Sequence, residues 1–140
     1  MKTLLKVTVL FFLSLWAFSS CELVGETNLD EPGAIDNLTQ TWVVDSAYID
    51  GLYDYVTDYS LFQLTINDNN TYELTNQNGE TFSGNWNLVS NESRLSLENS
   101  SGNTQTYTIL VLNEDELIVV TQTTAFKDQA VDLELQLKPI

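Results

Sequence analysis

Residues 62–84 read FQLTINDNNTYELTNQNGETFSG, in which apolar and polar residues alternate on both sides of two Asn-rich turns. An alternation with a period of two is typical of strands that bury one face. We interpret residues 68–70 and 77–79 as three-residue hairpin loops, with Gly79 in the left-handed conformation. The segment therefore predicts three consecutive antiparallel strands.

The register of these two hairpins follows from the requirement that the apolar side chains share one face. The second loop then pairs Leu74 with Phe82 and Tyr72 with Gly84, and the first loop pairs Ile66 with Tyr72. A two-residue turn in the second hairpin would instead divide the apolar residues between both faces. We expect the Tyr72 ring to cover Gly84, because an aromatic side chain often shields a glycine within a strand.

The same alternation extends over most of the chain beyond residue 38, most clearly at 131–138, which read VDLELQLK. No window there shows the apolar spacing of an amphipathic helix. Eight strand-like segments begin near residues 39, 59, 71, 80, 94, 104, 116 and 130. Their connections are mostly short and rich in Asn, Asp, Ser and Gly, which favours antiparallel hairpins. Eight such strands either close into a barrel, which removes the exposed edges, or divide into two packed sheets.

The first 20 residues differ in character from the rest of the chain. Two lysines accompany an apolar run, residues 4–18, which ends just before Cys21, the only cysteine. The run is about as long as the hydrophobic part of a signal peptide and shorter than the roughly 20 apolar residues that cross a bilayer. We therefore predict a secretion signal over residues 1–20.

The segment Phe18-Ser19-Ser20-Cys21 resembles the lipobox of bacterial lipoproteins. The resemblance implies that the chain is cut before Cys21, that the Cys21 thiol is joined to diacylglycerol, and that acyl chains such as palmitate form a lipid anchor. The alternative is an ordinary secretory signal that leaves Cys21 as a free thiol. Glu22 stands where lipoproteins retained in the inner membrane commonly carry Asp, which favours the outer membrane. Whether the protein faces the periplasm or the outside stays open.

Removal of the signal leaves a strongly acidic chain. It keeps all 20 acidic residues against three basic ones, Arg94, Lys127 and Lys138, which is a formal charge of −17. This charge repels the phosphate backbone, so nucleic acid is excluded as a partner, and anionic surfaces are poor partners too. We interpret the acidic segment 21–37 as a tether and residues 38–140 as a single domain.

The residue types offer little for catalysis. With one cysteine and no histidine, the chain has no intrachain disulfide, no thiolate or imidazole metal site and no His-based triad. Residues 68–73 begin like a calcium loop, but Tyr72 and Glu73 stand where an EF-hand requires an oxygen ligand and a glycine. Most carboxylates fall in turns or on outward strand positions, as expected for a solvated surface. We expect a non-enzymatic protein without metal or cofactor.

Several segments resemble bacterial lipocalin-like lipoprotein domains. They are Leu38 followed by Trp42, the Asn-rich turn before Thr71-Tyr72, residues 84–88 (GNWNL) and residues 115–117 (DEL). The resemblance covers about residues 38–139. It implies an all-β fold, a small antiparallel up-and-down barrel of about eight strands with an open end.

Tyrosines gather in the first connection of this barrel, between Tyr48 and Tyr59, where Asp50-Gly51 interrupts the strand. By lipocalin analogy this connection is a lid over the open end, where tyrosine rings stack on a sugar or flank an apolar ligand. The candidate ligand-binding residues are Tyr48, Tyr53, Tyr55, Tyr59, Trp42 and Trp86. In the alternative interpretation these side chains only pack the barrel or extend its strands.

Two functional hypotheses follow. In the first, a lipid-anchored envelope protein binds a small apolar or aromatic-stacking ligand inside the barrel, which requires a cavity of roughly a few hundred Å³. In the second, the barrel is a solid interaction or structural module that docks an envelope protein or glycan, which requires an exposed apolar patch. The sequence does not choose between them.

Overall fold

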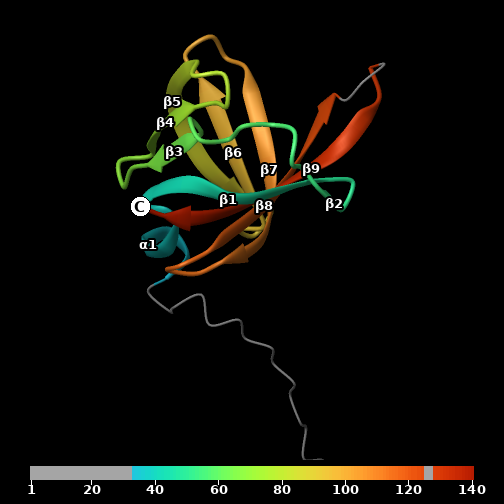
Figure 1. Ribbon diagram of the computed structural model, residues 1–140. Coiled ribbons are helices and arrows are strands. Elements are labelled where there is room, and N and C mark those ends of the chain that lie inside the picture. The colour runs from blue at the N-terminus through green and yellow to red at the C-terminus, as the bar shows by residue number, and fades with distance from the viewer. Residues whose placement is uncertain (1–32, 125–127) are drawn as a thin grey trace, which may run out of the picture.

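The computed structural model describes residues 33–124 and 128–140. These residues form one short helix, α1, and nine antiparallel strands, β1 to β9 (Figure 1). Their bounds are α1 Ala34–Leu38, β1 Thr41–Ile49, β2 Leu52–Tyr53, β3 Gln63–Ile66, β4 Thr71–Thr75, β5 Thr81–Val89, β6 Arg94–Asn99, β7 Thr104–Leu112, β8 Leu117–Thr124 and β9 Ala130–Pro139. No helix among the described residues combines the length and the apolar character needed to cross a bilayer.

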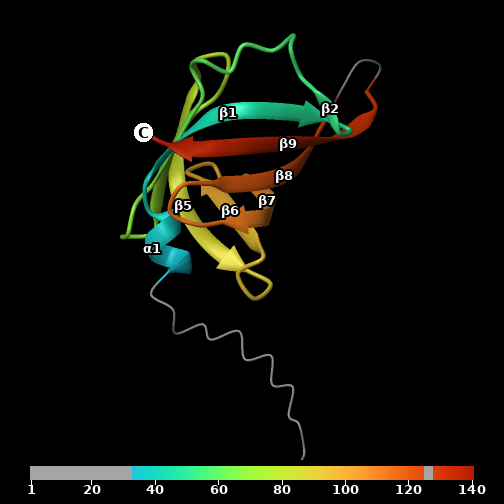
Figure 2. The ribbon, with the colours of Figure 1, turned by 60° about the horizontal axis from the view of Figure 1, so that its bottom comes forward.

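Strands β1 and β3 to β9 form a closed barrel, because each pairs with its neighbour and β9 also pairs with β1. This confirms the predicted all-β, eight-stranded antiparallel barrel. The observed strands begin within four residues of the predicted starts, and β2 is one additional strand that the alternation did not predict. Figure 2 shows β1, β9 and β8 side by side in the wall of the barrel.

The register of the two central hairpins is confirmed. Leu74 lies opposite Phe82, and Tyr72 lies opposite Gly84 on one side and Ile66 on the other. The loop glycine adopts the expected left-handed conformation, with a φ angle of 80° at Gly79. One buried face therefore continues through β3, β4 and β5, as the apolar pattern requires.

The reason for a glycine at position 84 differs from the expectation. A Cβ atom there would lie 1.9 Å from the carbonyl oxygen of Glu98 and 2.8 Å from the Cα atom of Asn99. The nearest atoms are thus backbone atoms of β6, and the Tyr72 ring is not among them. Gly84 is needed because two strands approach each other too closely for any side chain.

Helix α1 lies beside one end of the barrel, opposite the hairpin loops that join β4 to β5 and β6 to β7 (Figure 1). Leu38 is fully buried, and its carbonyl oxygen accepts a hydrogen bond from Nε1 of Trp42 at 3.0 Å. At the same end, Gln40 donates to the carbonyl oxygen of Glu114 in the turn between β7 and β8, at 3.2 Å. The pattern did not predict α1, which overlaps the end of the interpreted tether; residues 21–32 of that tether lie outside the described residues.

The first connection of the barrel begins with a tight hairpin. Asp50 and Gly51 have φ angles of 48° and 78°, the positive values that a two-residue turn of this kind requires. The turn folds β2 back along the second half of β1, so β3 pairs only with residues 41–43 at the start of β1. On this side the open end of the barrel is bordered by β2 and by the connection that follows it, residues 54–62.

Candidate functional site

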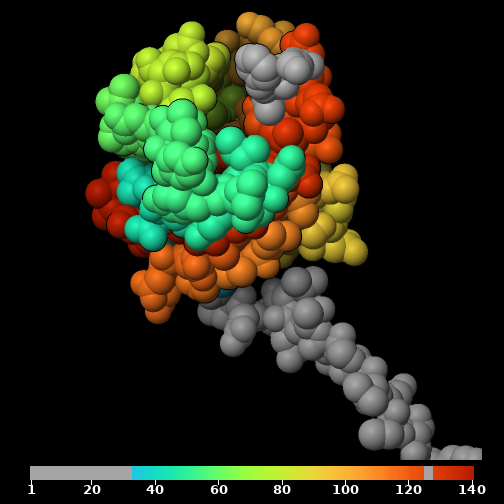
Figure 3. All heavy atoms as spheres, turned by 45° about the vertical axis from the view of Figure 1, so that its right-hand side comes forward, coloured from blue at the N-terminus to red at the C-terminus, as the bar shows by residue number. Residues whose placement is uncertain are grey.

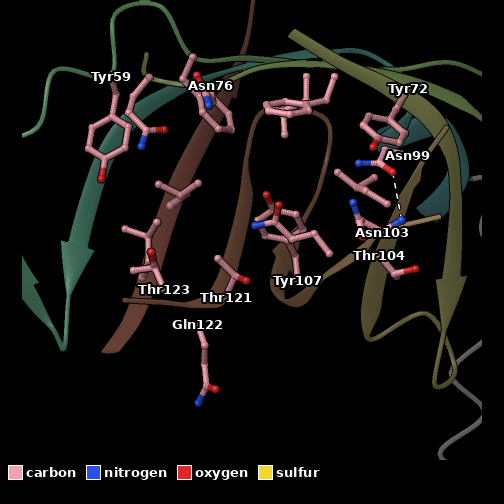
Figure 4. Close-up of a pocket in the computed structure, with 18 residues that line it drawn as sticks. Tyr59, Tyr72, Asn76, Asn99, Asn103, Thr104, Tyr107, Thr121, Gln122 and Thr123 are labelled. Atoms are coloured by element: carbon pink, nitrogen blue, oxygen red, sulfur yellow. Dashed lines mark hydrogen bonds between the residues drawn. The ribbon is translucent and has the colours of Figure 1, made fainter. Parts of the chain in front are cut away.

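A cavity of about 540 Å³ opens at the end of the barrel away from α1. Figure 3 shows the hollow at this end, with the segment after β1 along one side of it. Eighteen described residues line the cavity (Figure 4). Five are aromatic, namely Tyr59, Phe62, Tyr72, Phe82 and Tyr107. Four are leucines, namely Leu74, Leu97, Leu133 and Leu135. The other nine are uncharged and polar: Asn76, Gln77, Asn99, Asn103, Thr104, Gln105, Thr121, Gln122 and Thr123.

Of the six ligand-binding residues predicted from the sequence, only Tyr59 is among these lining residues. Trp42 and Trp86 are buried in the core instead. Their indole N–H groups donate to main-chain carbonyl oxygens, that of Leu38 at 3.0 Å and that of Asn67 at 2.7 Å. Both tryptophans therefore have the satisfied polar group and the burial of structural residues.

The other three predicted tyrosines lie outside the cavity. Tyr48 and Tyr53 face each other across β1 and β2, with ring centroids 5.7 Å apart and an interplanar angle of 80°. Tyr48 follows the buried Ala47, so it lies on the opposite face of β1 from the core. Tyr55 is 85% exposed. Of the four tyrosines in and beside this connection, only Tyr59 thus lines the cavity; the other lining side chain from the connection is Phe62.

Tyr59 is held at the cavity by the carboxylate of Asp54. Oδ1 of Asp54 accepts hydrogen bonds from the main-chain N–H groups of Val56 and Thr57, at 2.9 and 3.1 Å. Oδ2 accepts a hydrogen bond from the hydroxyl of Tyr59 at 3.1 Å. Burial raises the pKa of Tyr59, and the bond to this carboxylate raises it further. One carboxylate therefore organises the turn and positions the ring.

Loss of this carboxylate in Asp54→Asn is expected to lower the free energy of unfolding by about 0.5 to 1 kcal/mol at pH 7. The effect is small because Asp54 is partly exposed and water screens its interactions. Burial alone would raise the pKa of Asp54, but the hydrogen bonds that it accepts outweigh this, so its pKa is lower than the ordinary 3.8. Because the pKa of Asp54 is lower in the folded state than in the unfolded state, the ionised carboxylate stabilises the fold at any pH above its unfolded-state pKa. This stabilisation is lost as the pH falls through its folded-state pKa. Urea unfolding at pH 7 and pH 3 measures it.

The difference between wild type and Asp54→Asn should shrink at the acidic pH. The control is Tyr59→Phe, which removes the same hydroxyl contact from the other side. The effects of the two substitutions should be less than additive in the double variant, because both break one bond. Full additivity would show that the two side chains do not act together in solution.

The polar lining residues on β7 and β8 were not predicted from the sequence, although the pattern of these strands indicates them. Inward positions alternate along a strand, and on β8 Leu117 and Val119 are buried core residues. The next positions of the same face, Thr121 and Thr123, are polar and line the cavity. On β7 the buried Tyr107 is likewise followed towards the open end by Gln105. A buried face that turns polar at one end of two adjacent strands indicates the position of a cavity.

Two hairpin loops at the rim are built in the same way. Each begins with an asparagine whose Oδ1 accepts two main-chain N–H groups: Asn76 from residues 78 and 80, and Asn99 from residues 101 and 103, all at 2.9 to 3.0 Å. Each also contains a glycine at a φ angle of 80°, Gly79 or Gly102. Figure 4 shows the bond between Asn99 and Asn103. These bonds fix the loops, so this part of the rim is preformed.

Tyr72 and Tyr107 are the most buried aromatic residues of the cavity lining, at 3% and 5% exposed. Neither hydroxyl has a hydrogen-bond partner in the part of the chain that the structure describes. Among the described residues, every polar side-chain atom that is fully shielded from solvent has a hydrogen-bond partner. The two hydroxyls have no such partner, so they are not fully shielded and reach open space. Burial raises the pKa of both, and the neighbouring Tyr72 raises that of Tyr107 further. Both hydroxyls are therefore neutral groups that can donate to a ligand.

Metal binding finds no support in the geometry of the described residues. Within 33–124 and 128–140, no three Cys, His, Asp or Glu side chains come together as a metal site. None of the described lining residues of the cavity carries a charge. The arrangement can stack planar groups, bury apolar surface and exchange hydrogen bonds with neutral groups.

Comparison with protein-family models gave no match, and neither did comparison with curated proteins. Solved structures do resemble this chain. A lipocalin-like protein from Bacteroides uniformis ATCC 8492 matches with a TM-score of 0.50 and 13% identity, over 74% of this chain and 99% of that one. An uncharacterized protein from Bacteroides eggerthii DSM 20697 matches with a TM-score of 0.47 and 11% identity over the same shares. The first of these likenesses shows that the domain has a lipocalin-like fold.

Proposed function

We propose that this protein binds a small molecule in the cavity of its lipocalin-like barrel, and that a lipid on Cys21 anchors it in the bacterial envelope. The cavity carries the first part of the proposal. Its volume of about 540 Å³ lies within the roughly 300 to 1,000 Å³ of small-molecule sites. Aromatic and leucine side chains combined with a few convergent polar groups are also typical of such sites.

The anchor is supported by the sequence alone, because Cys21 lies outside the described residues. An export signal ending in a lipobox-like segment precedes it, and Glu22 after it favours the outer membrane. Binding rather than catalysis is supported by the lining of the cavity. It offers no carboxylate, amine, imidazole or thiol among the described residues, and these are the usual groups for acid, base or nucleophilic work.

Native mass spectrometry of the protein, isolated gently from its own host, tests the binding function. We expect a reproducible added mass that disappears on unfolding. Tyr59→Ala should weaken it, because the ring lies at the cavity, whereas Tyr55→Ala should leave it unchanged, because that ring is exposed. Equal effects of both substitutions, or an apo mass in every preparation, would contradict binding in this cavity.

A second candidate function is favoured by the exposed face of the first connection. Large apolar side chains are exposed along it, namely Leu52, Tyr53, Tyr55, Val56 and Leu61. Exposed apolar residues gathered on one segment are typical of a docking surface. In this hypothesis the segment binds an envelope protein or a glycan. Crosslinking in the host, followed by loss of the crosslinked species in Tyr55→Ala and not in Tyr59→Ala, would favour it over ligand binding.

A further inference from the structure

We infer that the cavity selects an uncharged ligand, one that carries a hydrogen-bonding group on a planar or apolar body, and that it rejects carboxylate ligands. The inference rests on the proposed binding function and names the ligand class of the same site. Three observations carry it: the absence of charge in the described lining, the position of the described basic residues, and two tyrosine hydroxyls that have no partner among the described residues.

The lining differs from the rest of the protein in its charge. Acidic residues make up 20 of the 140 residues, yet the eighteen described lining residues include none, and half of them are Asn, Gln or Thr. An ion that enters an uncharged cavity loses its hydration and gains no counter-ion, so either sign of charge is disfavoured there.

The described basic residues cannot supply a counter-ion for a carboxylate. Lys138 is on the outer face of the barrel, where its Nζ contacts Oδ1 of Asp45 at 2.6 Å and both side chains are exposed. Arg94 is exposed at the start of β6 and pairs with Thr108, on the side of Tyr107 away from the open end. The many carboxylates around the barrel also repel an anion at the mouth. Among the described residues, none therefore pairs with the head group of a fatty-acid-like ligand.

The hydroxyls of Tyr72 and Tyr107 disfavour a ligand without any polar group, just as the uncharged lining disfavours a charged ligand. Both tyrosines line the cavity and are buried, and their hydroxyls have no described partner. A purely apolar ligand would displace water from them and leave two buried donors unpaired, which is costly. A ligand with an amide, carbonyl or hydroxyl group satisfies them, while its ring stacks on the aromatic wall.

The test uses three probes of one shape that differ in charge: 2-naphthamide, 2-naphthoate and 2-naphthylmethylammonium, with naphthalene as the apolar reference. Titration of residues 22–140, which contain the whole closed barrel, at pH 7 and followed by naphthyl fluorescence gives the four affinities. We expect the amide to bind at least about tenfold more tightly than the carboxylate, because the anion is buried without a partner. It should also bind more tightly than the ammonium.

Tyr107→Phe should reduce the preference for the amide over naphthalene by about 3- to 10-fold, because one donor is lost. The matched control is Tyr48→Phe, which removes a hydroxyl from the face of β1 opposite the core and should leave the preference unchanged. Tighter binding of the carboxylate or of the ammonium would overturn the inference and leave the binding function standing. Failure of all four probes to bind up to the solubility limit of each would overturn the binding function itself.

Discussion

Replacement of Gly84 by alanine or valine is expected to cost about 3 kcal/mol or more of the free energy of unfolding, at the upper end of overpacking effects. A Cβ atom at this position would lie 1.9 Å from the carbonyl oxygen of Glu98. That oxygen belongs to the backbone of β6 and cannot move away as a flexible side chain would. The pairing of β5 with β6 must then separate locally, and both strands belong to the wall of the barrel.

Alanine makes the sharper test, because it adds only the Cβ atom. Where a strand glycine has free space around it, alanine raises the free energy of unfolding by about 0.5 to 1 kcal/mol. A close backbone contact at Gly84 instead predicts that Gly84→Ala lowers it. Ser83→Val is the control: its side chain is exposed on the same strand, and it should change stability by less than about 0.5 kcal/mol. Denaturant unfolding measures all three. A neutral or stabilising Gly84→Ala would contradict the close approach of β5 and β6.

Cys21→Ser is expected to abolish membrane association, or to leave the precursor uncut. Each methylene group buried in a bilayer contributes about 0.8 kcal/mol, so the loss of several acyl chains removes essentially all of the anchoring free energy. Electrostatic attachment cannot replace it, because residues 21–140 carry a formal charge of −17. Cell fractionation, with the mass of the mature N-terminus as a second readout, measures the result.

Glu22→Gln is the matched control for this substitution, because it changes the neighbouring residue and keeps the cysteine. It should leave the protein in the membrane fraction. If Cys21→Ser stayed in that fraction and still required detergent for its release, the lipid anchor would be refuted. The small-molecule binding function would be unaffected, since the described barrel does not include this residue.

The two ends of the barrel differ in a way that links the fold to the proposed function. At one end α1 lies beside the barrel, and the buried Trp42 donates to the carbonyl oxygen of Leu38. At the other end the inward face becomes polar, and preformed hairpin loops border the opening. A core that is solid at one end and hollow at the other provides both stability and space for the proposed ligand.

Strand number and register could be predicted from the sequence, because both depend on a local pattern. The side chains of a strand alternate between faces, so the position of Leu74 relative to Phe82 follows once the apolar residues must share one face. The loop length and the conformation of Gly79 are equally local, and both were confirmed. The small size and the single core likewise follow from the length of the chain.

The candidate site could be predicted only in part. Tyrosine content drew attention to the connection between β1 and β3, yet of its tyrosines only Tyr59 is on the cavity, held there by Asp54. Trp42 and Trp86 are packed in the core and do not line the cavity, although Leu97 opposite Trp86 does. Depth along the barrel depends on how far each strand is staggered against its neighbours, and no single strand carries that information.

The sequence by itself determined an acidic, histidine-free chain whose alternating strands pair in one register. Only the tertiary structure decided that the barrel closes between β1 and β9, that Gly84 faces the backbone of β6, and that polar residues from distant strands surround one cavity. The physical reason is the range of the interactions. Alternation and turn geometry act between neighbouring residues, whereas closure and cavity shape arise from contacts between residues far apart in the chain.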